Sequence, residues 1–338
     1  HLGANPRWLL VNSGNANAGT GPRGLEDARA TCHALAKLAG GSAQKVLPFS
    51  TGVIGEYLPV EKIEVALPSA LGGLSEDHWE QAARAIMTTD TYPKLASQVV
   101  DVGGYEVTVT GISKGAGMIQ PNMATMLAFI ATDACVEKSA LQGLLTDIAD
   151  RTFNCVTVDG DTSTNDACVL MASGKSPQLL SGTPAFEAFA GAVHSVLAQL
   201  SEAIVRDGEG ATKLIRIRVE GARDREEARL VGKTIAHSPL VKTAFFASDP
   251  NWGRILAAVG RAGCDNLVIE NVAIWLDDVQ IVESGGRCGR YTEEAGAKVM
   301  AQSEILIRVF LGRGDAQETV LTCDFSYDYV RINAEYRT

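Results

Sequence analysis

Thr125 is a lone hydroxyl at the start of an apolar stretch. It precedes the run 126–131 and follows SKGAGMIQ at 113–120, and no histidine or cysteine lies between residues 113 and 134. A core threonine bonded to backbone would account for it. A cut of the Ala124–Thr125 peptide bond would instead supply a base, because the α-amine of the new chain end titrates at about pH 8 and can take the hydroxyl proton. The same hydroxyl, attacking the preceding carbonyl, could make that cut.

Two further segments offer groups for acyl chemistry. FSTGVIG at 49–55 places Thr51 beside Gly52, so a hydroxyl and an N–H could converge on a developing oxyanion, although a simple turn would use the same residues. RDGEGATK at 206–213 holds Glu209 between two glycines just past a predicted helix end. The glycines favour a helix C-cap, and a carboxylate between them could also be presented to a cleft.

Other polar stretches are explained by turns. VNSGNANAGTG at 11–21 could cradle an anion at a helix start or form a capped turn, and SDPNWGR at 248–254 is typical of a turn before a helix. DGDTSTND at 159–166 fails the calcium-loop pattern, because Thr164 stands where that loop needs glycine and Leu170 where it needs glutamate. No histidine has a serine or cysteine nucleophile at a telling spacing. The sequence therefore predicts no metal site, and nothing in it points to a Ser-His-Asp triad.

The composition is that of a globular protein. The chain has 338 residues, of which 46% are hydrophobic and 21% charged. Its net charge of −10 argues against nucleic-acid binding as the main task, since a protein that reads phosphates needs a basic face. A local lysine pocket for a small charged metabolite remains compatible with this charge.

Cysteine usage and hydropathy bear on the compartment. The seven cysteines form no CxxC pair and no metal-type cluster, which favours reduced thiols in a cytoplasmic protein. No uninterrupted apolar run reaches the roughly 18 residues that a membrane helix needs, so we predict no membrane partner. The chain begins with His1 and not with methionine, and we expect its natural start to lie upstream.

Helical and β-type patterns are mixed along the chain. The predicted strands are 8–12, 45–50, 105–110, 155–158, 167–171, 214–219, 273–282, 305–311 and 318–329. The predicted helices are 25–38, 141–148, 196–204, 255–262 and 293–302. Strands dominate after residue 210, so we expect an α+β protein with an N-terminal catalytic region, 1–212, and a strand-rich domain, 213–338.

The segment KGAGMIQPNMATML at 114–127 resembles the self-cleavage segment of the ornithine acetyltransferase family, also called glutamate N-acetyltransferases. The likeness runs over essentially the whole chain and includes, in the family's order, LLVNSGNANAGTG, STGVIG, MTTDT, VTVDGDTSTND, DGEGATK, DPNWGR and INAEYRT. So many separate motifs in one order make the likeness specific to this family.

The resemblance implies a layered αββα-type sandwich of two interwound domains, related to the self-processing aminopeptidases of the DmpA kind. It implies cleavage before Thr125 into an α chain, 1–124, and a β chain, 125–338, assembled as an oligomer of αβ units such as a heterotetramer. It further implies acetyl transfer from N-acetylornithine to glutamate in arginine biosynthesis, through a ping-pong cycle without a cofactor. Some members also accept acetyl-CoA as donor.

The family's functional positions map onto nine residues of this sequence. Those implied to act in cleavage and catalysis are Ala124 and Thr125 at the cut, Thr125 as nucleophile, Thr51 and Gly52 as oxyanion donors, and Glu209 in proton transfer. Those implied to contact substrate are Thr88 (with Thr89 and Thr91 close by), Lys114, Thr125, Glu209, Asn333 and Thr338. A lysine can pair with a substrate α-carboxylate, and the polar chain end can complete a pocket.

Two other functions would use the same groups. A self-processing aminopeptidase or amidohydrolase on this fold would pass the acyl group to water instead of glutamate. A non-catalytic relative would stay uncut and only bind acetylated amino acids. The amino-acid-binding set, Lys114 with the tail 333–338, favours the transferase, and the presence of the catalytic residues disfavours the third function.

Overall fold

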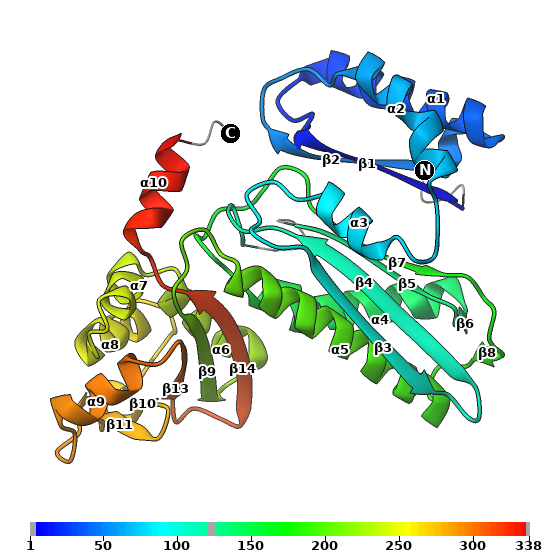
Figure 1. Cartoon of the computed structure of the whole chain (residues 1–338). Helices are drawn as coiled ribbons and strands as arrows, with labels where there is room; N and C mark the ends of the chain where they lie inside the picture. Colours follow the sequence, from blue (N-terminus) through cyan, green and yellow to red (C-terminus); the bar gives the residue numbers. More distant parts are fainter. Residues whose placement is uncertain (1–4, 121–125, 336–338) are drawn as a thin grey trace.

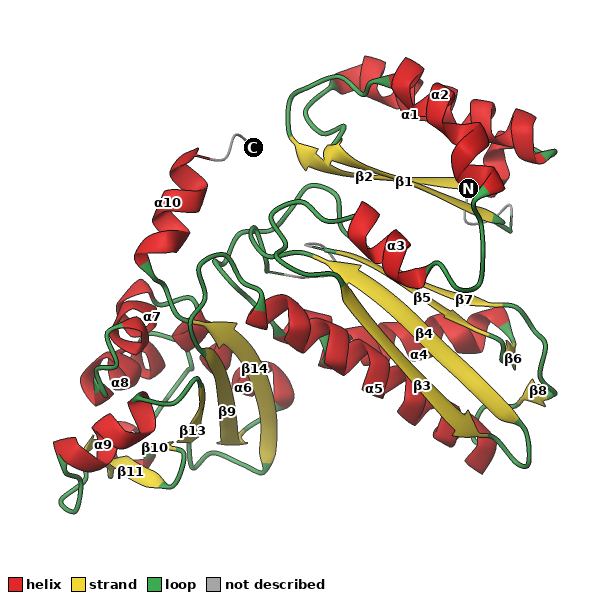
Figure 2. Ribbon diagram, in the orientation of Figure 1, coloured by secondary structure: helices red, strands yellow, loops and turns green. Residues whose placement is uncertain are grey.

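The structure, a computed structural model, describes residues 5–120 and 126–335 (Figure 1). Helices and sheets are mixed in it, which confirms the α+β class. Residues 8–206 form four layers: a helix pair, a two-stranded sheet, a four-stranded sheet and a second helix pair (Figure 2). This is the predicted αββα-type sandwich. A six-stranded sheet with its own helices follows from residue 214 onward.

The outer sheet is built by a parallel strand pair, which needs a crossover connection. Its elements are β1 (Trp8–Asn15), α1 (Gly21–Ala39), a short 3-10 turn η2 (Ala43–Lys45), β2 (Val46–Val53) and α2 (Val60–Gly72). The helix α1 supplies the crossover, and α1 and α2 cover the outer face of the sheet (Figure 1). Cys32, Leu35 and Val46 form part of the small apolar cluster that fixes α1 to the strands.

The central sheet carries the strand that follows Thr125. In spatial order its strands are β3 (Lys94–Asp101), β4 (Glu106–Lys114), β5 (Leu127–Thr132) and β7 (Ala167–Ala172), with β5 and β7 parallel. The face toward β1 and β2 also packs against α3 (Trp79–Ala85). Phe49 of β2 meets Phe129 of β5 edge-on, with ring centroids 5.1 Å apart. Such an aromatic contact joins the two sheets of the sandwich.

Two helices cover the other face of the central sheet: α4 (Lys138–Arg151) and α5 (Pro184–Arg206). The short parallel pair β6 (Cys135–Val136) and β8 (Gln178–Leu179) precedes these helices in sequence, one strand before each, and the 3-10 turn η3 (Phe153–Cys155) follows α4. Of the helices in the described ranges, α5 alone is long and apolar enough to cross a membrane. Its apolar residues, among them Val193, Leu197 and Ile204, are instead buried against the sheet, as in a core helix.

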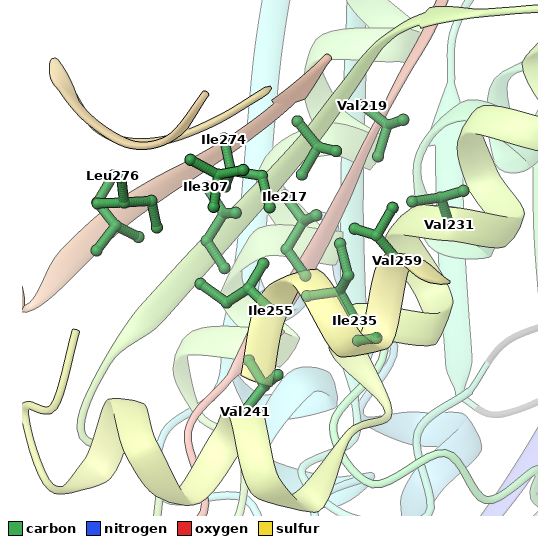
Figure 3. Packing of buried hydrophobic residues seen from close by; sticks show 14 of the residues in the cluster. Ile217, Val219, Val231, Ile235, Val241, Ile255, Val259, Ile274, Leu276 and Ile307 are labelled. Carbon is green, nitrogen blue, oxygen red and sulfur yellow. The ribbon is translucent and has the colours of Figure 1, made fainter. Parts of the chain in front are cut away.

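The second large sheet has the strand order β12-β11-β10-β13-β9-β14. Its elements are β9 (Leu214–Ala222), α6 (Arg225–Ala236), α7 (Pro239–Phe246), α8 (Trp252–Gly260), the 3-10 turn η4 (Ile269–Asn271), β10 (Ala273–Leu276), β11 (Val279–Glu283), β12 (Gly286–Arg287), α9 (Glu293–Met300), β13 (Glu304–Phe310) and β14 (Ala316–Cys323). Its core is made of branched side chains: Figure 3 shows Ile217 and Ile307 of the sheet facing Ile235 and Ile255 of the helices.

The last element, α10 (Tyr327–Glu335), leaves this second sheet and extends beside the loops of the first half (Figure 1). Ser326 Oγ donates to the carbonyl of Gly210, 2.6 Å away, which fixes the start of α10 next to the loop that carries Glu209. The helix α10 thereby starts next to the loop between α5 and β9. The division at 212/213 remains a prediction.

Three predicted strands are wrong in part. The segment 273–282 is a hairpin, β10 and β11, because Asp277 turns with φ of 47°. The segment 318–329 stops at the end of β14, and its last residues start α10. The segment 155–158 forms no strand, and its one β-type pairing is an isolated bridge from Val156 to Leu321. Apolar runs alone did not reveal these turns.

Candidate active site

Six of the nine predicted site residues lie around one pocket. They come from both halves of the chain, and they are Thr51, Gly52, Thr88, Lys114, Glu209 and Asn333. Met126 and Leu127, the residues that follow Thr125 in sequence, line the same pocket. The other three predicted residues, Ala124, Thr125 and Thr338, lie outside the described residues. The pocket thus stands where the chain resumes after the predicted cut.

Lys114 is the cation of this pocket. It ends β4, and only 8% of its surface is exposed. Its Nζ donates to Thr88 Oγ1 at 2.8 Å and to Thr51 Oγ1 at 3.1 Å. Burial lowers the pKa of Lys114, and the nearby carboxylate of Asp90 acts in the opposite direction. Of the threonines at 88, 89 and 91, Thr88 is the one bonded to Lys114, while Thr91 donates to the carboxylate of Asp207.

Thr51 and Gly52 lie at the end of β2, beside β1. Thr51 Oγ1 accepts from Lys114, which leaves its own proton free to donate. Gly52 has φ of 129°, and a Cβ there would lie 2.4 Å from the carbonyl carbon of Gly14. Only glycine allows the two strands to approach so closely. The hydroxyl and the adjacent backbone N–H are held by a strand end, as a preorganised oxyanion site requires.

Glu209 also lines the pocket. Its side chain is buried, its N–H donates to the carbonyl of Ala116 at 2.9 Å, and its Oε2 accepts from Asn333 Nδ2 at 2.7 Å. Gly117 lies directly against it, because a Cβ at that position would be 2.4 Å from the carboxylate. The Glu209 carboxylate therefore lines the pocket, so the segment with its two flanking glycines is not only a C-cap of the helix α5.

A buried charge network behind the pocket was missed by sequence reasoning. Lys94 Nζ donates to Asp90 Oδ1 and to Asp207 Oδ2, each at 2.6 Å, and all three side chains are at most 2% exposed. Asp90 also accepts from the N–H groups of Gly115 at 2.7 Å and Thr88 at 3.0 Å. Burial opposes the ionisation of Asp90, but Lys94, Lys114 and the Gly115 N–H outweigh it and lower its pKa.

This network joins three segments that line the pocket. Asp90 fixes the loop before β3 to the end of β4, and Asp207 lies two residues before Glu209 at the end of α5. The spacing of Asp90 and Lys94, four residues apart, was visible in the sequence. Their pairing with Asp207 was not, because that residue is 113 positions away.

Asp166 is a second carboxyl that the sequence did not single out. It lines the pocket at the start of β7, and its Oδ2 is buried without a hydrogen-bond partner among the described residues. Burial raises the pKa of Asp166 to about 7, against the effects of a Ser163 hydrogen bond and of Lys114. The charge of this wall therefore changes across neutral pH, from neutral on the acid side to negative on the basic side.

The remaining motifs have structural roles. In the loop 11–21, Asn15 and Asn17 use their side chains on nearby backbone, and Asn251 caps α8 by accepting from the N–H of Arg254. Asp159 likewise accepts from three backbone N–H groups. Over residues 5–120 and 126–335, no three His, Cys, Asp or Glu side chains are grouped as a metal site would require.

Comparison with known proteins places these motifs in one family. The sequence profile of the ArgJ family matches residues 1–338. The arginine biosynthesis bifunctional protein ArgJ of Methylococcus capsulatus is 68% identical over 340 residues, which cover 100% of this chain and 83% of that protein. The protein of the same name from Pseudomonas syringae pv. tomato is 58% identical, over 98% of this chain and 83% of its own length.

A solved structure agrees with these sequence matches. The crystal structure of arginine biosynthesis bifunctional protein ArgJ from Bacillus halodurans is 41% identical and superposes with a TM-score of 0.58. The match covers 60% of this chain and 96% of that one. With the family profile spanning residues 1–338, the chain belongs to the ArgJ family, which confirms its resemblance to the ornithine acetyltransferases.

Proposed function

We propose that this chain is a self-cleaving acetyltransferase of arginine biosynthesis, with Thr125 as its nucleophile. It would carry an acetyl group from N-acetylornithine to glutamate. The observation that carries the proposal is the pocket that gathers Thr51, Lys114, Glu209 and Asn333 next to the residues that follow Thr125. Relatives named arginine biosynthesis bifunctional protein, at 68% and 58% identity, support the same activity.

The maturation step makes the base that the sequence lacks. Thr125 Oγ attacks the carbonyl carbon of Ala124, the C–N bond between the two residues breaks, and the hydroxyl proton ends on the departing amine. Water then hydrolyses the resulting ester, which restores the hydroxyl and leaves Ala124 as a carboxylate. The freed α-amine of Thr125 titrates at about pH 8, so it can accept the hydroxyl proton in the next reaction.

Two acyl-transfer half-reactions follow in the pocket. Thr125 Oγ attacks the acetyl carbonyl of the donor, and the Thr51 hydroxyl with the Gly52 N–H donates to the oxyanion that forms. The donor's C–N bond breaks, its amine takes a proton, and ornithine leaves acetyl-Thr125 behind. The amine of glutamate then attacks the ester, which releases N-acetylglutamate and the free hydroxyl. One nucleophile serves both amino acids, so the cycle is ping-pong.

Charge in the pocket suits amino-acid substrates. Lys114 is buried and held by two threonine hydroxyls, and it can pair with an α-carboxylate at a fixed place. Glu209, fixed by Asn333, can accept a proton from the incoming amine or return one to the leaving amine. A cation and a carboxylate in one pocket would orient a substrate that carries both charges.

The setting of the enzyme is part of the proposal. All seven cysteines are free thiols, which is typical of a reducing compartment and supports a cytoplasmic enzyme. We infer an oligomer of αβ units with no resident cofactor, and acetyl-CoA as a second donor for glutamate. Both the assembly and the second donor are open to direct measurement.

The test is a transfer assay on the purified protein. N-acetylornithine and glutamate are supplied together, and ornithine, N-acetylglutamate and free acetate are each quantified by mass spectrometry. We expect ornithine and N-acetylglutamate in equal amounts, and parallel lines in double-reciprocal plots when both substrates are varied. A separate reaction with acetyl-CoA and glutamate tests the second donor.

Other outcomes of that assay identify the competing functions. Ornithine with an equal amount of acetate, independent of glutamate, would mean a hydrolase that uses water as acceptor. An uncut chain that binds N-acetylornithine without any product would mean a non-catalytic relative. Either result would replace the transferase assignment.

Gly117→Ala should lower the transfer rate with the fold intact. The added methyl group would overlap the Glu209 carboxylate at 2.4 Å, so the glutamate must move away from its place. Displacement of a catalytic group by about 1 Å costs roughly 10²-fold in rate. Gly143→Ala, on α4 with nothing within 4 Å of the new methyl, is the matched control and should keep full activity. Equal activity of both variants would contradict the role of Glu209.

A further inference from the structure

The loop 157–167, which the predicted reaction does not use, contacts the chain just before the predicted cut. Asp159 Oδ2 accepts from the N–H of Met118 at 2.6 Å, and Asp159 Oδ1 accepts from the N–H of Ile119 at 2.9 Å. The carbonyl of Ile119 in turn accepts from the N–H of Val158 at 2.8 Å and from Thr157 Oγ1 at 2.9 Å. Both main-chain groups of Ile119 are thus held by this one loop.

The held segment has an unusual backbone conformation. Met118 has φ of 53°, in the left-handed region that a residue with a long side chain rarely adopts. A residue in this conformation persists only where its surroundings hold it. Here the N–H groups of Met118 and Ile119 are held by their hydrogen bonds to Asp159. The contact continues at Gln120, whose carbonyl accepts from Thr162 Oγ1 at 3.4 Å.

The far end of the same loop holds the chain after the predicted cut. The N–H of Ala167 donates to the carbonyl of Met126 at 2.8 Å, and β7 then pairs in parallel with β5 from Leu127↔Ala167 onward. The loop 157–167 therefore contacts residues 118–120 on one side and residue 126 on the other. It spans the two flanks of the Ala124–Thr125 bond.

Asp159 and Thr157 do not belong to the substrate pocket. Neither residue lines it, Thr157 is fully buried, and among the described residues the carboxylate of Asp159 accepts only from backbone N–H groups. Burial raises the pKa of Asp159, against those same N–H groups. A half-buried carboxylate that accepts from main-chain amides is placed to fix a backbone.

We propose that Asp159 and Thr157 are positioning residues for self-cleavage, which hold the flanks so that the Thr125 hydroxyl reaches the Ala124 carbonyl. Attack on the preceding peptide bond needs the reacting atoms about 3 Å apart and a main chain bent to allow it. A free segment would relax away from that geometry, whereas fixed flanks keep it. The inference rests on the self-cleavage of the proposed function.

The experiment follows cleavage of newly made full-length chain with time, by intact mass under denaturing conditions. Asp159→Asn replaces one acceptor oxygen by a donor that faces an N–H, and we expect cleavage about 10²-fold slower. Asp161→Asn makes the same charge change on an exposed side chain of the same loop and should cleave at the wild-type rate.

A second pair of variants tests the hydroxyl. Thr157→Val keeps the side-chain shape but loses the bond to the Ile119 carbonyl, and it should slow cleavage by roughly 10- to 100-fold. Thr157→Ser keeps the hydroxyl and should restore the rate. Val231→Ala, a core truncation in α6, supplies a variant that is destabilised elsewhere, and it should cleave normally despite a lower melting temperature.

The possible results separate the two proposals. Wild-type cleavage of Asp159→Asn or Thr157→Val in a folded chain would overturn the positioning role while leaving the enzyme assignment standing. Slowing of Val231→Ala to the same extent would also overturn it, since stability alone would then explain the effect. If Asp159→Asn does not fold, the comparison of Thr157→Val with Thr157→Ser decides. A wild-type chain that is never cut would instead refute self-cleavage itself.

Discussion

Thr125→Ala should give a single uncut chain with no measurable acetyl transfer. Without the hydroxyl, neither the attack on the Ala124 carbonyl nor the formation of acetyl-Thr125 can occur. Removal of a covalent nucleophile costs roughly 10⁴-fold or more in rate, because only binding and oxyanion stabilisation remain. Intact mass under denaturing conditions reports the cut, and the release of ornithine from N-acetylornithine reports the chemistry.

Thr125→Ser is the matched control for this prediction. It keeps a hydroxyl on the same backbone, so we expect it to be cut and to retain part of the transfer activity. A Thr125→Ala protein found as two pieces, with the second beginning at residue 125, would show that another group attacks the Ala124 carbonyl. Residual transfer near the wild-type rate would remove Thr125 from the catalytic cycle.

Lys94→Met should cause the largest loss of stability of any single substitution in the pocket region. It would leave the carboxylates of Asp90 and Asp207 buried beside an uncharged side chain, without the ammonium group that both contact. Breaking a buried ion pair by removing one partner costs about 3–5 kcal/mol, because the remaining charge is uncompensated. For a protein of 338 residues that corresponds to a drop of roughly 4–7 °C in the thermal unfolding midpoint.

Two further variants test whether the loss of stability comes from the uncompensated buried charge or simply from the loss of a lysine. Lys298→Met removes an ion pair of the same i,i+4 spacing, Lys298 with Glu294, whose side chains are 75% and 83% exposed, and it should change stability by less than about 1 kcal/mol. The double variant Lys94→Met with Asp207→Asn should lose less than the two single variants added together. Similar melting temperatures for Lys94→Met and Lys298→Met would contradict this account of the network.

The sequence predicted those elements whose patterns are local. The alternation over 105–110 overlaps the first residues of β4, and the helical spacing over 196–204 falls within α5. The strand β3 and the helices α2 and α3 were not predicted. The pattern of α2 is interrupted by Pro68, α3 has only 7 residues, and most residues of β3 are exposed. Short or weakly buried elements form because of their neighbours, which a single window cannot show.

The site could be predicted only as far as family motifs reach. Those motifs named Thr51, Lys114 and Glu209, which the structure brings together although residues 51 and 209 are far apart in the sequence. They gave no sign of the charge network behind the pocket, because Lys94 pairs with Asp207 across 113 positions. Contacts between distant, individually ordinary polar residues carry no sequence pattern, so only a structure reveals them.

The position of the proposed cut has a consequence for refolding. The strands β4 and β5 are hydrogen-bonded neighbours in the middle of the central sheet, yet β4 ends before the Ala124–Thr125 bond and β5 begins after it. Cleavage there would leave the pieces interlocked in the native sheet, but it would delete the short connection by which one strand finds the other. A mature protein that has been fully denatured must renature by an encounter of two chains. Its recovery should depend on protein concentration, whereas an uncut Thr125→Ala chain should refold at a rate independent of dilution.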